Sequence, residues 1–166
     1  MKTALRNALA VGIVALGAGA CASKADPSAV NYTLRFPSVE AAIASEQVQV
    51  LVFDAPADPA ARASACVDKI AKRLRRDALD PQQASDPVSM CEMFLKKPRF
   101  EVPYGEKVVF AIAQKKGQDF LLGCTVQTLG DGDAPVPISL ALADIANPVP
   151  ATQCATVGDF CAGRCK

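Results

Sequence analysis

Two stretches decide the fold of this chain: VVFAIA at residues 108–113 and FLLGCTVQT at residues 120–128. The first is a continuous apolar run, which is typical of a strand buried on both faces. Alternate residues of the second are expected to share one face of a strand: Phe120, Leu122, Cys124, Val126 and Thr128. Between the two stretches, KKGQ at residues 115–118 has the length and composition of a hairpin loop. The sequence therefore predicts a long central β-hairpin.

Four further segments outside this hairpin have the pattern of strands. Residues 31–36 and 136–142 alternate apolar with polar side chains, which is typical of half-buried strands. Residues 48–53 are nearly all apolar, as a central strand would be, and residues 100–102 form a short strand before a Pro-Tyr-Gly turn. Strands with frequent turns predict a mainly β fold, an antiparallel β-sandwich stabilised by disulfides, spanning residues 30–147.

Three helices are predicted from their start signals. Ser38 caps a short helix that ends near Ala44. Asp58-Pro59 combines a capping carboxylate with proline at the first helical position, and Asp80-Pro81 is the predicted end of that helix. Asp86-Pro87 repeats the signal for a helix at about residues 87–95. The last two helices form an insert in the sandwich at about residues 59–96.

The helix that begins at Pro59 is amphipathic. Its predicted apolar face is periodic at helical spacing: Ala63, Cys66, Val67, Ile70, Leu74 and Ala78. Basic residues are expected mostly on the opposite face: Arg62, Lys69, Lys72, Arg73 and Arg76. These five are candidates for contact with anionic lipid, lipopolysaccharide or an acidic protein. A solvated face is the simpler interpretation, because cations near a helix C-terminus also stabilise the helix dipole.

The N-terminal residues have the pattern of an export signal. Lys2 and Arg6 precede an apolar stretch at residues 8–20, and Ala18-Gly19-Ala20 leads directly into Cys21. This pattern resembles the lipobox of bacterial lipoproteins. The resemblance implies a signal peptide at residues 1–20, acylation of Cys21 with fatty acids such as palmitate, and a tether at residues 21–29.

The residues that follow Cys21 bear on the destination of the chain. Ala22 and Ser23, with no Asp, resemble the signal for the outer membrane of the bacterial envelope. The small residues before Cys21 also fit an ordinary signal-peptidase site, which would give a secreted or periplasmic protein without lipid.

A second resemblance concerns the fold. Pro103, Gly105 and Gly123-Cys124 lie where a Pro-x-Gly turn leads into a long hairpin. The stretch at residues 100–142 is similar to the later strands of transthyretin-like and immunoglobulin-like domains. This resemblance implies a fold and no activity.

The chain has seven cysteines, and six remain if Cys21 carries lipid. An exported protein is expected to pair them as disulfides: Cys66, Cys91, Cys124, Cys154, Cys161 and Cys165. If the helix packs against the sandwich, Cys66 on the helix and Cys124 on the hairpin are both expected to point toward the core, so they are the favoured pair. Cys91 is then expected to bond one cysteine of the Cys-rich tail at residues 148–166, and the other two to bond each other.

Composition and motifs exclude several functions. The chain has 18 Lys and Arg against 17 Asp and Glu. Because nucleic-acid binding favours a strong basic excess, we expect no nucleic-acid partner. The chain has no His, no CxxC pair and no phosphate-binding glycine loop, so we expect no metal and no small-molecule cofactor. Asp131 and Asp133 suit a turn better than a calcium loop, which needs six to eight oxygen ligands.

The sequence thus predicts an envelope-anchored lipoprotein that acts as a binding or structural module, with no evident catalytic residue. Its partners would be the membrane, through the lipid, and an envelope protein or polymer. One alternative is a hydrolase of envelope glycans that uses two carboxylates, for which Glu92, Glu101 and Glu106 are candidates. The other is a binder of anionic lipid or lipopolysaccharide that uses the basic helix.

Overall fold

The computed structural model describes residues 28–30, 32–96, 100–130 and 135–165. The predicted signal peptide, the lipidation site Cys21, most of the tether, and the turn residues Asp131 and Asp133 lie outside these ranges. Within them, no helix is both long enough and apolar enough to cross a membrane.

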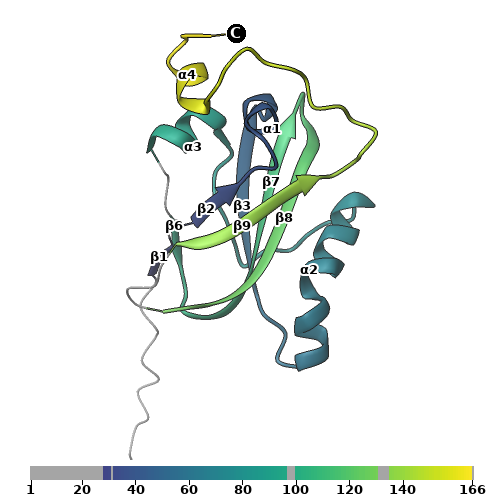
Figure 1. Cartoon of the computed structure of the whole chain (residues 1–166). Helices are drawn as coiled ribbons and strands as arrows, with labels where there is room; N and C mark the ends of the chain where they lie inside the picture. The colour runs from purple at the N-terminus through teal and green to yellow at the C-terminus, as the bar shows by residue number, and fades with distance from the viewer. Residues whose placement is uncertain (1–27, 31, 97–99, 131–134, 166) are drawn as a thin grey trace, which may run out of the picture.

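The described part of the chain is mainly β, with a seven-stranded sheet at its centre (Figure 1). Its main path runs in the order β2 (Tyr32–Arg35), β9 (Val136–Leu142), β8 (Gln118–Leu129), β7 (Gly105–Lys115), β3 (Gln47–Asp54) and β4 (Gln83–Ala84). The seventh strand, β5 (Val88–Ser89), pairs with the other end of β3. A separate antiparallel pair joins β1 (Ser28–Val30) to β6 (Phe100–Val102).

The predicted antiparallel β-sandwich is not confirmed. The main sheet is mixed, because β2 pairs with β9 in parallel, with Tyr32 opposite Val136 and Leu34 opposite Ile138. β2 is separated from β9 in the chain by nearly the whole domain, so no hairpin constrains its direction. The described strands form this one large sheet and the β1–β6 pair, and a helix at Pro59–Leu74 packs against one face of the large sheet.

The predicted hairpin is the β7–β8 pair, and it closes through a tight turn. Lys116 and Gly117 both have positive φ, at 53° and 70°, as a two-residue type I′ turn requires. The register shifts beside the turn: Ala113 lies opposite Leu121, and Gln114 lies opposite Asp119. Phe120 is therefore the extra residue of a β-bulge, which reverses the face its side chain occupies.

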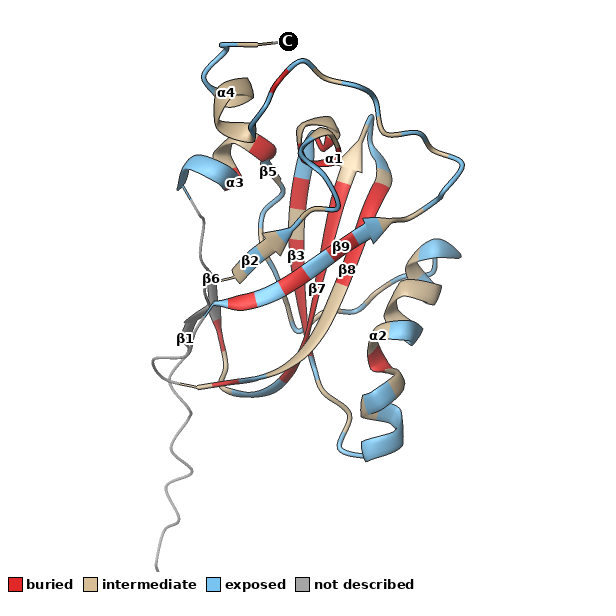
Figure 2. Ribbon diagram, in the orientation of Figure 1, coloured by how far each residue is buried: buried red, intermediate tan, exposed pale blue. Residues whose placement is uncertain are grey.

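The two faces of the sheet carry separate buried clusters (Figure 2). Leu51, Phe110, Ile112 and Leu122 form one cluster, against which Cys66 and Ile70 of α2 (Pro59–Leu74) pack. Phe120 belongs to the opposite cluster, so the prediction that it shares a face with Leu122 was wrong.

The opposite cluster joins β3 to strand β9, although β9 is not its neighbour in the sheet. Val48 and Val50 of β3 are buried together with Ile138 and Leu140 of β9. The strongly twisted sheet thus turns β9 across its own face (Figure 1). Gly123 of β8 permits the close crossing, because a Cβ there would lie 2.5 Å from the carbonyl oxygen of Ser139.

Two helices begin at their predicted caps, whereas α2 ends earlier and the next helix begins later than predicted. Ser38 caps α1 (Val39–Ala44), and Asp58 caps α2 (Pro59–Leu74) by accepting a 2.7 Å hydrogen bond from the Ala61 amide. α2 ends before its predicted stop at Asp80-Pro81. α3 (Met90–Lys96) begins later than predicted, because Val88–Ser89 pairs with β3 as β5.

One disulfide fastens a helix to the sheet, and two others hold the tail. Cys66–Cys124 joins α2 to β8 and confirms the favoured pair. Cys91–Cys161 joins α3 to α4 (Val157–Cys161) in the tail, and Cys154–Cys165 closes the tail on itself. The cysteines predicted to pair are thus all bonded, with Cys161 as the tail partner of Cys91.

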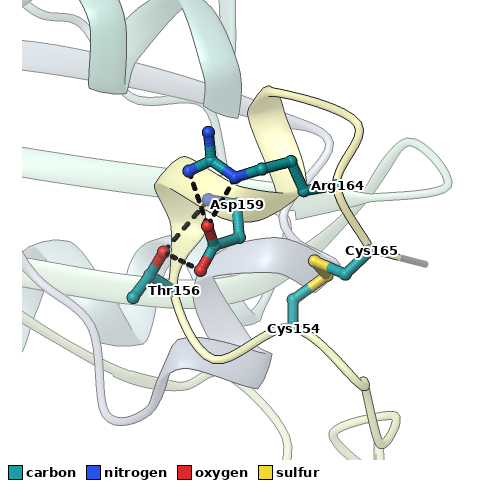
Figure 3. Close-up of polar contacts among 5 residues, drawn as sticks. All are labelled: Cys154, Thr156, Asp159, Arg164 and Cys165. Atoms are coloured by element: carbon teal, nitrogen blue, oxygen red, sulfur yellow. Dashed lines mark hydrogen bonds and ion pairs between the residues drawn. A yellow bond between two sulfur atoms is a disulfide. The ribbon is translucent and has the colours of Figure 1, made fainter.

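A polar network also orders the tail (Figure 3). Thr156 caps α4, because its hydroxyl accepts from the Asp159 amide at 3.0 Å and donates to the Asp159 carboxylate at 2.8 Å. Arg164 donates to the same carboxylate from Nε at 2.8 Å. Val149 and Val157 of the tail pack on the buried cluster that contains Met93. The tail is therefore docked on the domain by packing as well as by a disulfide.

Candidate functional site

An open polar cleft of about 530 Å³ lies where three segments meet: the C-terminal end of α2, the β7–β8 turn and the segment after β9. Amide, carboxylate and guanidinium groups dominate its lining, which consists of Arg73, Leu74, Arg76, Gln114, Gly117, Gln118, Asp119, Ala143, Asp144 and Asn147. The volume is in the range of small-ligand sites, although such sites are more often apolar. The cleft contains two of the predicted basic residues, Arg73 and Arg76.

α2 forms one wall of the cleft, but the face that it packs against the sheet differs from the predicted apolar face. Of the predicted apolar face, Cys66 and Ile70 pack against the sheet, whereas the others are exposed: Ala63, Val67, Leu74 and Ala78. Val67 retains 67 % exposure. The stripe that faces the sheet also includes three of the basic residues, Arg62, Lys69 and Arg73.

These three basic side chains contact the sheet rather than solvent alone. Arg62 pairs with Glu106 of β7 at 2.8 Å, and the ammonium of Lys69 lies 3.8 Å above the centre of the Phe53 ring. Burial, together with the charge of neighbouring Lys72, lowers the pKa of Lys69. Long basic side chains can cover apolar surface in this way while their charged ends reach partners. The prediction that they lie mostly on the solvated face was therefore wrong for these three.

Arg73 and Asp119 hold the centre of the cleft. The guanidinium of Arg73 donates two hydrogen bonds to the Asp119 carboxylate, from Nε at 2.5 Å and from Nη2 at 2.8 Å. The side-chain amide of Gln114 donates to the same carboxylate at 3.2 Å. Burial would raise the pKa of Asp119, but the hydrogen bonds from Arg73 and Gln114 outweigh it and hold that pKa below its ordinary value.

Arg76 lies just past the end of α2 in a left-handed backbone conformation, with φ 62°. Its amide donates to the Arg73 carbonyl at 2.9 Å, and the next amide, of Asp77, donates to the Lys72 carbonyl at 3.0 Å. These two bonds define a Schellman motif, which usually places glycine at this position. Because the sequence has Arg there, it gave no signal that the helix would end at Leu74.

The segment after β9 forms the opposite wall. The Ala143 amide donates to the Phe120 carbonyl at 2.9 Å, which fixes the start of the segment to β8. The Asp144 carboxylate accepts from the Ala146 amide at 2.8 Å in a local turn. Ile145, between them, is 92 % exposed. The wall thus presents the Asp144 carboxylate to the cleft, whereas Ile145 lies outside the lining.

The other candidate residues lie elsewhere. Lys72 is exposed on α2, outside the cleft lining. Glu92 pairs with Lys96 at 2.8 Å, Glu106 pairs with Arg62, and the side chain of Glu101 is not described. In the described ranges, no group of three or more Asp, Glu, Cys or His residues is arranged to hold a metal ion.

Several polar residues of the site were missed by the sequence analysis. Gln114 and Asp119 flank the predicted hairpin loop, and Asp144 and Asn147 follow the last predicted strand. Outside the cleft lining, the buried Lys107 was also missed: its ammonium donates to Gln82 at 2.9 Å and to Asp54. The sequence does show polar residues at the ends of the predicted strands, which could have suggested a site. Only the fold shows which of these strand ends lie together in the cleft.

Comparison with protein-family models, with curated protein sequences and with solved structures finds no match for this chain. The resemblances to lipoprotein signals and to transthyretin-like or immunoglobulin-like domains therefore stay predictions.

Proposed function

We propose that this protein is an exported lipoprotein, held in the bacterial envelope by acylated Cys21, that binds an envelope component through the polar cleft. The observation that carries the proposal is the position of the cleft. The described chain begins with β1 at one end of the domain, and the three segments that form the cleft gather toward the opposite end (Figure 1).

The tether is short, so it would keep the β1 end of the domain close to the membrane and the cleft farther from it. Residues 22–27 separate Cys21 from β1. An extended chain advances at most about 3.6 Å per residue, so β1 would lie within roughly 25 Å of the lipid surface. A cleft at the far end of the domain would then open away from the membrane that anchors it. Such an orientation suits binding to a partner outside that membrane surface.

The disulfides support export. Cys66–Cys124 and Cys91–Cys161 each link segments far apart in sequence, and such bonds persist in oxidising compartments outside the cytoplasm. Cys66–Cys124 also fixes α2, which forms one wall of the cleft, to β8. Rigid supports lower the entropic cost of binding a ligand.

Asp119 does not suit the role of general acid in a glycan hydrolase. A glycosidase needs one carboxyl group that stays protonated near neutral pH, so that it can act as the general acid. Asp119 has a lowered pKa and is committed to Arg73 and Gln114. A carboxylate in that environment is an acceptor of hydrogen bonds rather than a proton donor.

Binding through the cleft is also favoured over binding of anionic lipid by the basic helix. Arg62 and Arg73 pair with carboxylates, and Lys69 covers Phe53, so three of the five candidate cations have partners within the domain. A membrane-binding helix face presents its cations to headgroups and its apolar residues to the acyl boundary. α2 instead directs this stripe toward the sheet.

A crosslinking experiment in the producing bacterium tests the proposed function. A photo-reactive amino acid replaces Gln118, which is exposed in the cleft, or Ser139, which is exposed on β9 as a control. We expect a specific adduct with an envelope component from position 118 and none from position 139. Identical adduct patterns, or no adduct from position 118, would count against the cleft as the binding site.

A further inference from the structure

Arg76 occupies a backbone position that disfavours it. Its φ of 62° lies in the left-handed region, which costs roughly 1–2 kcal/mol for a residue with a side chain. α4 ends in the same way, with the Gly163 amide bonded to the Phe160 carbonyl and the Arg164 amide to the Asp159 carbonyl, but there the left-handed residue is Gly163. Strain retained by a non-glycine residue at a cleft points to a role for its side chain.

The charge of Arg76 is available to a ligand. Arg73 beside it is already paired with Asp119, and Arg75 is paired with Asp77. Arg76 is exposed and forms no salt bridge or hydrogen bond through its side chain with any residue that the structure describes. Its positive charge contributes to lowering the pKa of Asp119. A guanidinium in this state binds a carboxylate through two parallel hydrogen bonds.

The rest of the cleft limits what kind of anion would enter. Asp119 and Asp144 line the same space, so a doubly charged phosphate would meet two carboxylates. A singly charged carboxylate that also brings hydrogen-bond donors, such as an ammonium, would find an acceptor in Asp144. The amides of Gln118 and Asn147 can both donate and accept, which suits a peptide backbone.

The cleft edge also offers apolar contact. Leu74 and Ala143 line the cleft together with Arg76, and Leu74 is 52 % exposed. Exposed apolar residues at the edge of a polar cleft suit small apolar side chains of a bound segment. The combination of charge, amide and apolar groups therefore matches a short peptide.

We propose, building on the proposed binding function, that the cleft binds a short peptide with a free terminal carboxylate. Arg76 binds the carboxylate, Asp144 accepts from an ammonium of the peptide, and Leu74 contacts a small side chain. Such peptides occur as free chain ends and as the short peptides attached to cell-wall polymers, and both sources share this chemistry.

The test uses the full mature chain in detergent and two probes: the tripeptide Lys-Ala-Ala with a free carboxylate, and the same tripeptide with a C-terminal amide. Binding is followed by NMR chemical shifts of the cleft amides. We expect the acid to bind, with shifts at Gln114, Gln118 and Asn147, and the amide to bind about tenfold more weakly. Equal affinities, or shifts that map outside the cleft, would overturn the proposal.

Arg76→Gly is the matching variant, because glycine relieves the left-handed strain. We expect its Tm to rise by about 2–4 °C while its affinity for the acid falls to that of the amide. Lys72→Ala is the control, since it removes a neighbouring positive charge outside the cleft and should bind as the parent does. Retained affinity in Arg76→Gly would overturn the assignment of the carboxylate to Arg76.

Co-sedimentation with purified cell-wall polymer distinguishes the two sources. Sedimentation of the parent but not of Arg76→Gly would indicate that the peptide is attached to the polymer, whereas binding of the soluble tripeptide alone would indicate free chain ends.

The proposed function and this inference can fail separately. Specific adducts from position 118 together with equal affinity for acid and amide would keep the binding function and remove the peptide.

Discussion

Arg73 of α2 and Asp119 of β8 form a two-point ion pair across the polar cleft, and the Gln114 amide donates a further hydrogen bond to the same carboxylate. Both side chains are largely shielded from solvent, at 31 % and 21 % exposure. The pair therefore fixes the C-terminal end of α2 to the β7–β8 hairpin, at the place where the cleft opens. It links the stability of the domain to the shape of the proposed site.

Asp119→Asn should reduce the free energy of unfolding at pH 7 by about 1–2 kcal/mol, because the charged hydrogen bonds to Arg73 become neutral ones. The folded-state pKa of Asp119 is lowered, so its stabilising contribution is present above the unfolded pKa of about 3.9 and is lost as the pH falls through the folded pKa. Urea unfolding at pH 7 and near pH 2.5 measures both effects.

A matched control is Asp77→Asn, which removes the exposed pair of Asp77 with Arg75 and should cost less than about 0.5 kcal/mol. A difference between Asp119→Asn and the parent that persists unchanged at the acidic pH would contradict this interpretation of Asp119.

The Cys66–Cys124 disulfide should contribute more to stability than the Cys154–Cys165 disulfide. Each is removed by replacing both of its cysteines with Ala. Cys66 and Cys124 are 58 residues apart, and the chain-entropy model gives about 4 kcal/mol. The Cys154–Cys165 pair, 11 residues apart, should cost about 3 kcal/mol. Chemical denaturation of the two variants checks the order, and a larger cost for the short loop would refute it.

Loss of the Cys91–Cys161 disulfide should loosen the tail while the sheet stays folded. α4 has five residues, and Val149 and Val157 supply limited packing, so the segment depends strongly on this bond. Limited proteolysis of the Cys91→Ala, Cys161→Ala variant should cut within residues 148–165. The Cys154→Ala, Cys165→Ala variant keeps the bond to α3 and should be cut more slowly; equal rates would show that the bond does not hold the tail.

Gly123→Ala should destabilise the protein by about 1–3 kcal/mol, because the new Cβ would lie 2.5 Å from the Ser139 carbonyl oxygen and force β9 away. Gly158→Ala is the control: its Cβ would lie 3.5 Å from the Phe94 ring, an ordinary contact, and Ala favours a helix. Thermal unfolding of both variants measures the effect. A neutral Gly123→Ala would mean that β9 does not cross β8 this closely.

Local patterns predicted the local structure well. The alternation at residues 136–142 matches β9, Ser38 and Asp58 cap their helices as expected, and the central hairpin closes where KKGQ indicated. These features depend on side-chain period, capping and turn chemistry, which the sequence shows directly.

Features that depend on distant contacts were not predictable in the same way. The bulge that moves Phe120 to the other face follows from the register of β7 with β8, and the parallel direction of β2 follows from its pairing with β9. The rotation of α2 is set by its packing on the sheet and by the partners of Arg62 and Arg73. The cleft itself joins residues from three separate segments, and no single stretch of sequence contains its pattern.

The central claim is that this is a lipid-anchored domain closed by disulfides, and the intact mass of the native protein tests it most directly. The mass is measured after alkylation, with and without prior reduction. We predict the mass of residues 21–166 plus acyl groups, with six thiols alkylated only after reduction. A mass without acyl groups would contradict the anchor, and thiols that react before reduction would contradict the disulfides.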